Sequence, residues 1–191
     1  MSTNINKTSL GDRYAEITVV VVTVIALLAG WFYKSSVETR SVAFESDGVS
    51  AAVPDGWLQS QAEGNLIRAT DRTSAGFPTT YAISKLAVAA DVTAAQAASF
   101  QTLDRSQQLT GFRVLNQQTV LANGQEAYQV SYVFVDYNPN ATQAEIPSVV
   151  RGVDYTFVKG GQAITVSFWA DEHEYEAGLN RFNRFLSSVK F

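Results

Sequence analysis

The sequence predicts an α+β protein in which a single N-terminal transmembrane helix precedes an antiparallel β-sheet with a few helices. Three observations carry this prediction: an uncharged apolar run over 17–33, strand-like segments that come in pairs joined by turn residues, and two later segments with helix-capping signals. Of the 191 residues, about 150 follow the apolar run, which suits one domain rather than two. We expect a tail over 1–16, a transmembrane helix over 17–34, a linker over 35–40 and a soluble domain over 41–191.

The apolar run contains no charged residue and lies between Glu16 and Lys34. At about 1.5 Å per residue its roughly 17 residues reach ~25 Å, which suffices for a hydrocarbon core of ~30 Å if the flanking side chains extend to the headgroups. Tyr14 and the aromatic residues 31–33 are typical interfacial anchors. We therefore expect a single-pass protein of the cell membrane, with a cytoplasmic N-terminus and an extracytoplasmic C-terminal domain.

Three other interpretations of this run are weaker. A buried core helix is disfavoured because the β-branched residues 19–22 and their neighbours leave no polar face. A cleaved signal peptide fits the small residues Ala29 and Gly30, but the bulky Trp31 that follows them favours retention. A lipoprotein signal fails because Trp31 stands where the acylated cysteine would have to be.

Composition excludes several classes of function. The net charge is −4 and basic residues do not cluster, so we expect no nucleic-acid partner. The chain has no cysteine, which removes disulfides, thiolate nucleophiles and cysteine-based metal sites. With 46% hydrophobic and 17% charged residues, the domain has the composition of a globular protein held together by packing alone.

Hairpin signals organise most of the domain. Asp47-Gly48 and Asn123-Gly124 are dipeptides that favour tight turns between antiparallel strands, and Lys159-Gly-Gly161 is a third turn. The strand-like segments cover 42–44, 49–53, 66–70, 79–88, 112–121, 126–137, 149–158 and 163–169.

Two helices are predicted within the domain. Thr93 and Gln96 have the form of a capping box, and the helix that follows, with Ala97, Phe100 and Leu103 at helical spacing, stops near Gly111. The last helix is capped by Asp171 and has an acidic first turn that complements the helix dipole. Its apolar stripe, which we expect to pack on the sheet, consists of Tyr175, Leu179, Phe182, Leu186 and Val189.

The order of these pieces resembles the PsbP-type domain. The resemblance rests on the opening segment Phe44–Trp57 with its Val-Pro-Asp-Gly-Trp motif, the long central hairpin, the segment Ala170–Tyr175, and the closing Phe185-Leu-Ser-Ser-Val189. It covers most of residues 41–191 and implies about six antiparallel strands sandwiched between helices in an α/β/α arrangement. Many members of that superfamily, including the extrinsic photosystem II subunit, are non-catalytic accessory proteins; a transmembrane anchor is a departure from them.

Residues able to carry chemistry are few. The only histidine, His173, lies in an acidic segment and would share a helix face with Glu176. Two groups are fewer than a metal site needs, so an acidic first helical turn is the favoured interpretation. Asp136, Asp154 and Asp171 adjoin predicted strand ends, where solvated carboxylates are ordinary, although a catalytic pair among them stays open.

The chain also lacks a Gly-x-Ser-x-Gly motif and any evident nucleophile–base pair. We therefore expect no enzymatic activity and assign no catalytic, cofactor-binding or metal-binding residue and no cofactor. The long loop over 137–147 is either a contact surface or a tolerated insertion.

Two functions fit these features. The first is a non-catalytic accessory subunit whose partners are the membrane bilayer and other subunits of a membrane protein complex, with the domain capping the extracytoplasmic face. Small or hydroxylated positions suited to close helix contact support it: Thr18, Thr23, Ala26, Ala29 and Gly30. The alternative is a membrane-tethered ligand-binding module with a pocket between sheet and helix, lined by Trp57, Trp169 and Tyr132.

Overall fold

The computed structural model describes residues 10–38, 40–61, 64–74, 76–137 and 147–191. The chain divides into two compact units between Arg40 and Ser41.

The first unit contains one helix, α1 (Leu10–Glu38), which extends past both ends of the apolar run. The hydroxyls of Thr18 and Thr23 each donate a 2.8 Å hydrogen bond to the backbone carbonyl four residues earlier, at Tyr14 and Val19. The helix thereby satisfies these hydroxyl groups itself. Among the residues whose placement is described, no helix is both long enough and apolar enough to cross a membrane. The membrane span expected over 17–34 is not confirmed.

The second unit is built on antiparallel strands. Of the described residues, seven strands form one sheet in the order β3-β4-β5-β9-β8-β7-β6, and two more form the separate hairpin β1-β2. The strands are β1 (Ser41–Ser46), β2 (Val49–Pro54), β3 (Leu58–Ser60), β4 (Ile67–Thr70), β5 (Thr80–Ala87), β6 (Arg113–Ala122), β7 (Gln125–Asp136), β8 (Ser148–Lys159) and β9 (Gln162–Asp171).

The predicted hairpin turns are confirmed. Asp47-Gly48 joins β1 to β2 and Asn123-Gly124 joins β6 to β7, and all four residues have the positive φ angles that such two-residue turns require. The expected number of about six strands is too low, because the domain has seven strands in its main sheet and the β1-β2 hairpin in addition. The short strand β3 has no alternating pattern of its own and forms only by pairing with β4.

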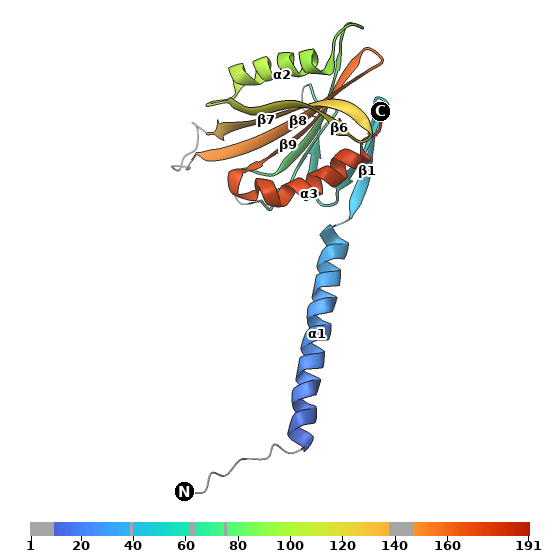
Figure 1. Cartoon of the computed structure of the whole chain (residues 1–191), viewed down its shortest axis with the longest axis vertical. Coiled ribbons are helices and arrows are strands. Elements are labelled where there is room, and N and C mark those ends of the chain that lie inside the picture. The colour runs from blue at the N-terminus through green and yellow to red at the C-terminus, as the bar shows by residue number, and fades with distance from the viewer. Residues whose placement is uncertain (1–9, 39, 62–63, 75, 138–146) are drawn as a thin grey trace. The chain divides into compact units, whose positions relative to one another are not determined.

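Two helices cover opposite faces of the main sheet, as Figure 1 shows for α2 (Ala94–Gln108) and α3 (Glu172–Ser188). The α/β/α arrangement is therefore confirmed. The capping box of α2 is present, with the Thr93 hydroxyl accepting from the Gln96 backbone N–H and the Gln96 side chain accepting from the Thr93 backbone N–H. At α3, the Asp171 carboxylate accepts a 3.0 Å hydrogen bond from the His173 backbone N–H.

The hydrophobic core has two parts because neighbouring residues of a strand point to opposite faces. On β8, Val153 and Phe157 lie on the α3 side, whereas Val150 lies on the α2 side. The α3 side holds the larger cluster, which includes the predicted helix stripe and also Phe185, a residue the stripe omits. The β1-β2 hairpin packs on this side and is joined to the chain end by paired backbone hydrogen bonds between Ser50 and Lys190.

Candidate functional site

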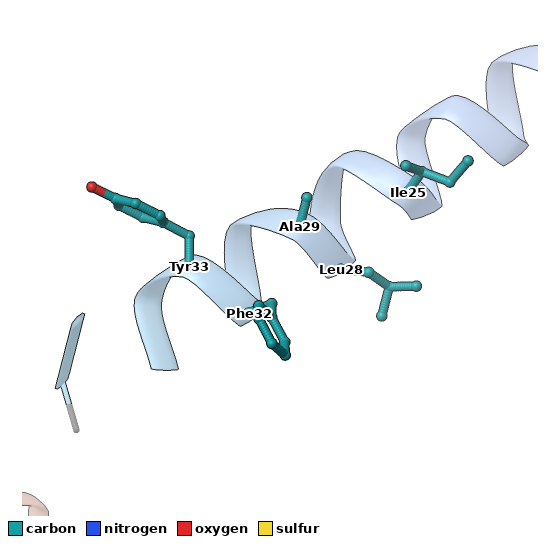
Figure 2. A pocket seen from close by; sticks show the side chains of 5 residues that line it. All are labelled: Ile25, Leu28, Ala29, Phe32 and Tyr33. Carbon is teal, nitrogen blue, oxygen red and sulfur yellow. The ribbon is translucent and has the colours of Figure 1, made fainter. Parts of the chain in front are cut away.

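Helix α1 carries its apolar side chains exposed on every side. All residues over 17–33 are exposed, and their large apolar side chains lie between 48% and 72% exposed. One side of the helix has a shallow, open depression, where Figure 2 shows the short side chain of Ala29 between longer neighbours. The residues that border this depression follow the i, i+3, i+4, i+7 spacing of one helix face: Ile25, Leu28, Ala29, Phe32 and Tyr33.

A buried polar centre lies beneath α2. Arg105 extends from α2 to the sheet, where its Nη2 donates 3.1 Å hydrogen bonds to Oδ1 of Asp154 and to Oγ of Ser167. Its Nε lies 3.0 Å from Oδ2 of Asp154, without the geometry of a hydrogen bond. The Asp154 side chain is buried and that of Arg105 is only 12% exposed, so α2 is fixed to β8 by a charge pair as well as by Ala98, which packs in the same cluster as Val150.

Aromatic rings complete this centre. Tyr132 donates a 3.1 Å hydrogen bond to Asp154 and accepts one from the indole N–H of Trp169. The Arg105 guanidinium lies over both rings, 5.2 Å from the centroid of Tyr132 and 4.8 Å from that of Trp169. Burial raises the pKa of the Asp154 carboxyl, and the neighbouring Arg105 opposes this effect. The centre is thus a network in which Asp154 is bonded to Arg105 and Tyr132, and Tyr132 to Trp169.

Asp154 therefore corrects the expectation of a solvated acid at a strand end. It lies in the middle of β8, is only 4% exposed, and faces α2. The sequence contains a usable signal, because aspartate is disfavoured inside strands and a mid-strand aspartate needs a buried partner. Nothing in the spacing identifies Arg105 as that partner, since the two residues are far apart in the chain and meet only when α2 packs on the sheet.

A groove lies between α2 and the edge strand β6. It has a volume of about 410 Å³ and a mixed lining of hydroxyl and apolar groups. The lining residues are Ser99, Thr102, Leu103 and Ser106 from α2, together with Phe112, Val114 and Gln117. The groove exists because α2 packs over β7 and β8 and leaves the adjoining face of β6 uncovered.

The prediction of a ligand pocket lined by Trp57, Trp169 and Tyr132 is wrong. Trp57 packs on the α3 side, with its ring 4.5 Å from the ring of Tyr81. Trp169 and Tyr132 belong to the α2 side. The sheet separates these residues because they point to opposite faces of it, and Tyr132 is fully buried.

His173 is placed at the first turn of α3 and is 92% exposed at its side chain. Its Nδ1 lies 2.9 Å from Oδ1 of Asp171, whereas Glu176 forms an ion pair with Arg151. The hydrogen bond to Asp171 raises the pKa of His173, and the backbone N–H of His173, followed by its ring, lowers the pKa of Asp171. Across the described ranges, no three acidic, histidine or cysteine side chains gather as metal ligands would.

Comparison with solved structures identifies the fold. The solution structure of the cyanobacterial PsbP protein CyanoP from Synechocystis matches with a TM-score of 0.58 and 16% sequence identity, over 79% of this chain and 92% of that one. The domain has a PsbP-like fold. A crystal structure from Bacteroides thetaiotaomicron also matches, with a TM-score of 0.52 and 14% identity, over 80% of this chain and 48% of that one. No protein-family model and no curated protein matches the chain.

The PsbP-like domain contains the features on which the resemblance rests. Phe44–Trp57 forms the β1-β2 hairpin and the turn after it, and Ala170–Tyr175 joins β9 to α3. The loop over 137–147, expected as a contact surface or an insertion, lies almost wholly outside the described residues. The PsbP-like domain thus offers two features for functional argument, the buried centre beneath α2 and the groove beside β6.

Proposed function

We propose that this chain is a single-pass, membrane-anchored, non-catalytic accessory subunit of a membrane protein complex, with its PsbP-like domain on the extracytoplasmic face. The observation that carries the proposal is the run of exposed apolar side chains around α1. Removing one large aliphatic side chain from water is worth about 1.5–3 kcal/mol, so an uncovered run of this length is strongly unfavourable in water. A bilayer covers it on every side at once.

Further details of α1 support insertion into lipid. The two threonine hydroxyls within the run are satisfied inside the helix, as hydrocarbon surroundings demand. The apolar run is short for a bilayer, but α1 continues for 29 residues in all and has aromatic residues at both ends of the run. Local thinning of the bilayer and interfacial anchoring accommodate a mismatch of this size at modest cost.

A role as a subunit is supported by the face of α1 that bears Ala29. A small side chain between larger ones lets a second helix approach closely, and such positions are enriched where membrane helices pack. A non-catalytic role is supported by the PsbP-like domain, in which the buried charges of Arg105 and Asp154 pair with each other and the single histidine is bonded to Asp171, the N-cap of α3.

Membrane fractionation tests the anchor. We expect the wild-type chain to stay with membranes after alkaline extraction. The double variant Val21→Arg/Leu28→Arg should be released, because each central arginine costs about 2.5–3.5 kcal/mol on insertion. Leu86→Arg, at an exposed leucine of the domain, is the matched control and should stay with the membranes. A wild-type chain found in the supernatant would contradict the anchor.

Sidedness can be tested with single cysteines, because the natural chain has none. We expect an impermeant maleimide to label Gln108→Cys in intact cells, and to label Ser2→Cys only after permeabilisation. The opposite pattern would reverse the orientation.

Membership of a complex is tested by solubilising native membranes in mild detergent. We expect the chain to migrate with other membrane proteins at a mass well above its own. A chain that migrates only alone would contradict the role of subunit.

A further inference from the structure

Strand β6 is an open edge of the main sheet. It is ten residues long and pairs with β7 on one side, while within the described residues no strand pairs with its other side. The opposite edge, β3, has only three residues. An edge as long as β6 presents a row of unpaired backbone N–H and C=O groups that another strand can satisfy.

The register identifies which groups face outward. Ala122 and Gln125 flank the two-residue turn and form a hydrogen-bonded pair, after which bonded and non-bonded pairs alternate along an antiparallel ladder. Leu121, Thr119 and Gln117 are therefore non-bonded to β7, and their N–H and C=O groups point to the open side. These are the groups that a further strand would engage.

The same three residues direct their side chains to the α2 side of the sheet. Val120 and Ala122, which alternate with them, pack into the cluster on the α3 side, and Gln117 itself lines the groove beside α2. The groove therefore borders β6 at Val114 and Gln117, on the same face of the sheet as the side chains of Thr119 and Leu121.

Natural edge strands are commonly protected by lysine, proline or inward-pointing charges. β6 has none of these between Val114 and Ala122, and only a bulge interrupts it between Val114 and Asn116. Instead it exposes Leu115 and Leu121, and at 80% Leu121 is the most exposed large apolar side chain in the described part of the chain. The edge is thus unblocked and exposes two leucines.

We propose that β6 pairs antiparallel with β6 of a second copy of this chain, about a two-fold axis at Thr119. In this register Thr119 lies opposite its own counterpart, and Leu121 of each copy lies beside Gln117 of the other, at the groove between α2 and β6. The most exposed apolar side chain and the groove are then brought together twice, as a two-fold interface requires. The inference goes beyond the proposed function and does not depend on α1.

Complementarity favours a second copy over an unrelated strand. A central pair of threonines is a favourable cross-strand pair, and the outward groups of β6 match those of its two-fold mate without a shift. Arg113 is the only charged residue of β6 and lies outside the central pairs of this register. No like charges are placed opposite each other along the paired strands.

Cross-linking of single cysteines tests the interface in the full-length chain, in membranes or detergent. Residues of a bonded antiparallel pair have Cα atoms about 5.5 Å apart, within the range that a disulfide spans. We expect Thr119→Cys to form a covalent dimer under mild oxidation. Gln59→Cys, exposed on the opposite edge strand β3, is the matched control and should remain monomeric.

A second substitution separates pairing from chance collision. Adding Leu121→Lys to Thr119→Cys should reduce the dimer yield several-fold, whereas adding Leu86→Lys, also at an exposed leucine, should leave it unchanged. The proposal is overturned if Thr119→Cys gives no more dimer than Gln59→Cys, if Gln118→Cys cross-links in its place, or if Thr119→Cys links only to a different protein. Loss of membrane binding by itself would leave the expected cross-link intact.

Discussion

Gly152 shows how a single hydrogen atom in place of a side chain shapes the centre beneath α2. It lies on β8 directly under two aromatic rings, and a Cβ there would overlap the ring of Tyr132 and lie 2.8 Å from Cδ1 of Trp169. The absence of a side chain lets the Trp169 indole reach the Tyr132 hydroxyl and lets Arg105 lie over both rings.

We predict that Gly152→Ala lowers the free energy of unfolding by about 1–3 kcal/mol, because the added methyl group overpacks a site whose neighbours are fixed by hydrogen bonds. Urea denaturation followed by tryptophan fluorescence measures the change. Gly30→Ala, where an added Cβ meets nothing within 4 Å, is the control and should leave the domain transition in place. An unchanged midpoint for Gly152→Ala would mean that the rings shift without cost.

The Arg105–Asp154 pair is a second feature that acts at the scale of single residues. Removing one member of a buried ion pair leaves the other charge without compensation, whereas replacing both by apolar groups avoids that penalty. The pair therefore holds α2 in place mainly because separating Arg105 from Asp154 would leave each charge without its partner.

We predict that Asp154→Leu destabilises the domain by about 3–5 kcal/mol, and that the double variant Arg105→Met/Asp154→Leu recovers a large part of this loss. A double-mutant cycle on the free energy of unfolding gives the coupling between the two side chains. A loss in the double variant equal to the sum of the losses in Arg105→Met and Asp154→Leu alone would show that the two side chains do not interact.

At the scale of the element, the start of α3 combines a helix cap with an ionisable pair. Asp171 has a lowered pKa and His173 a raised pKa, each with the other as its main cause. The contribution of Asp171 is present above its ordinary pKa near 3.8 and is lost as pH falls through its folded-state pKa. The contribution of His173 is present below its ordinary pKa near 6.5 and is lost as pH rises through its raised folded-state pKa.

We predict that Asp171→Asn lowers the pKa of His173 toward its ordinary value, as measured by NMR titration of the imidazole. Asparagine is also a good N-cap residue, so this change removes the charge and keeps the cap. Glu176→Gln, which breaks the ion pair to Arg151, is the control and should leave the titration of His173 largely in place. A titration unaffected by Asp171→Asn would refute the pairing.

Local signals predict most of these elements, because each depends on residues close together in the chain. Four local features lie where the sequence predicts them: the capping box of α2, the N-cap of α3, the Asp47-Gly48 turn and the Asn123-Gly124 turn. Strand β3 is not predicted, because its three residues are all exposed and show no alternation of buried and exposed side chains. Phe100 and Leu103 share a helix face as their spacing indicates, yet both stay exposed, since α2 is held at its buried side by Arg105 and alanines.

At the scale of the whole molecule, the sequence predicts the layers but not how the strands are ordered within them. The pairing of β5 with β9 has no local signal, because the turn residues that identify hairpins act only between consecutive strands. The candidate sites could not be predicted from the sequence for the same reason. The Arg105–Asp154 centre and the groove beside β6 each join α2 to strands distant in sequence, and the separation of Trp57 from Trp169 follows from strand faces that spacing alone did not reveal.

The position of β9 also affects how the domain folds during translation. This strand lies in the middle of the sheet, between β5 and β8, yet it is made after all the other described strands. While the ribosome adds residues at about 5–20 per second, β5 waits with one edge unpaired until β9 emerges. Pairing between strands so far apart in sequence is slow to form, which makes the nascent chain vulnerable to aggregation until β9 has paired with β5.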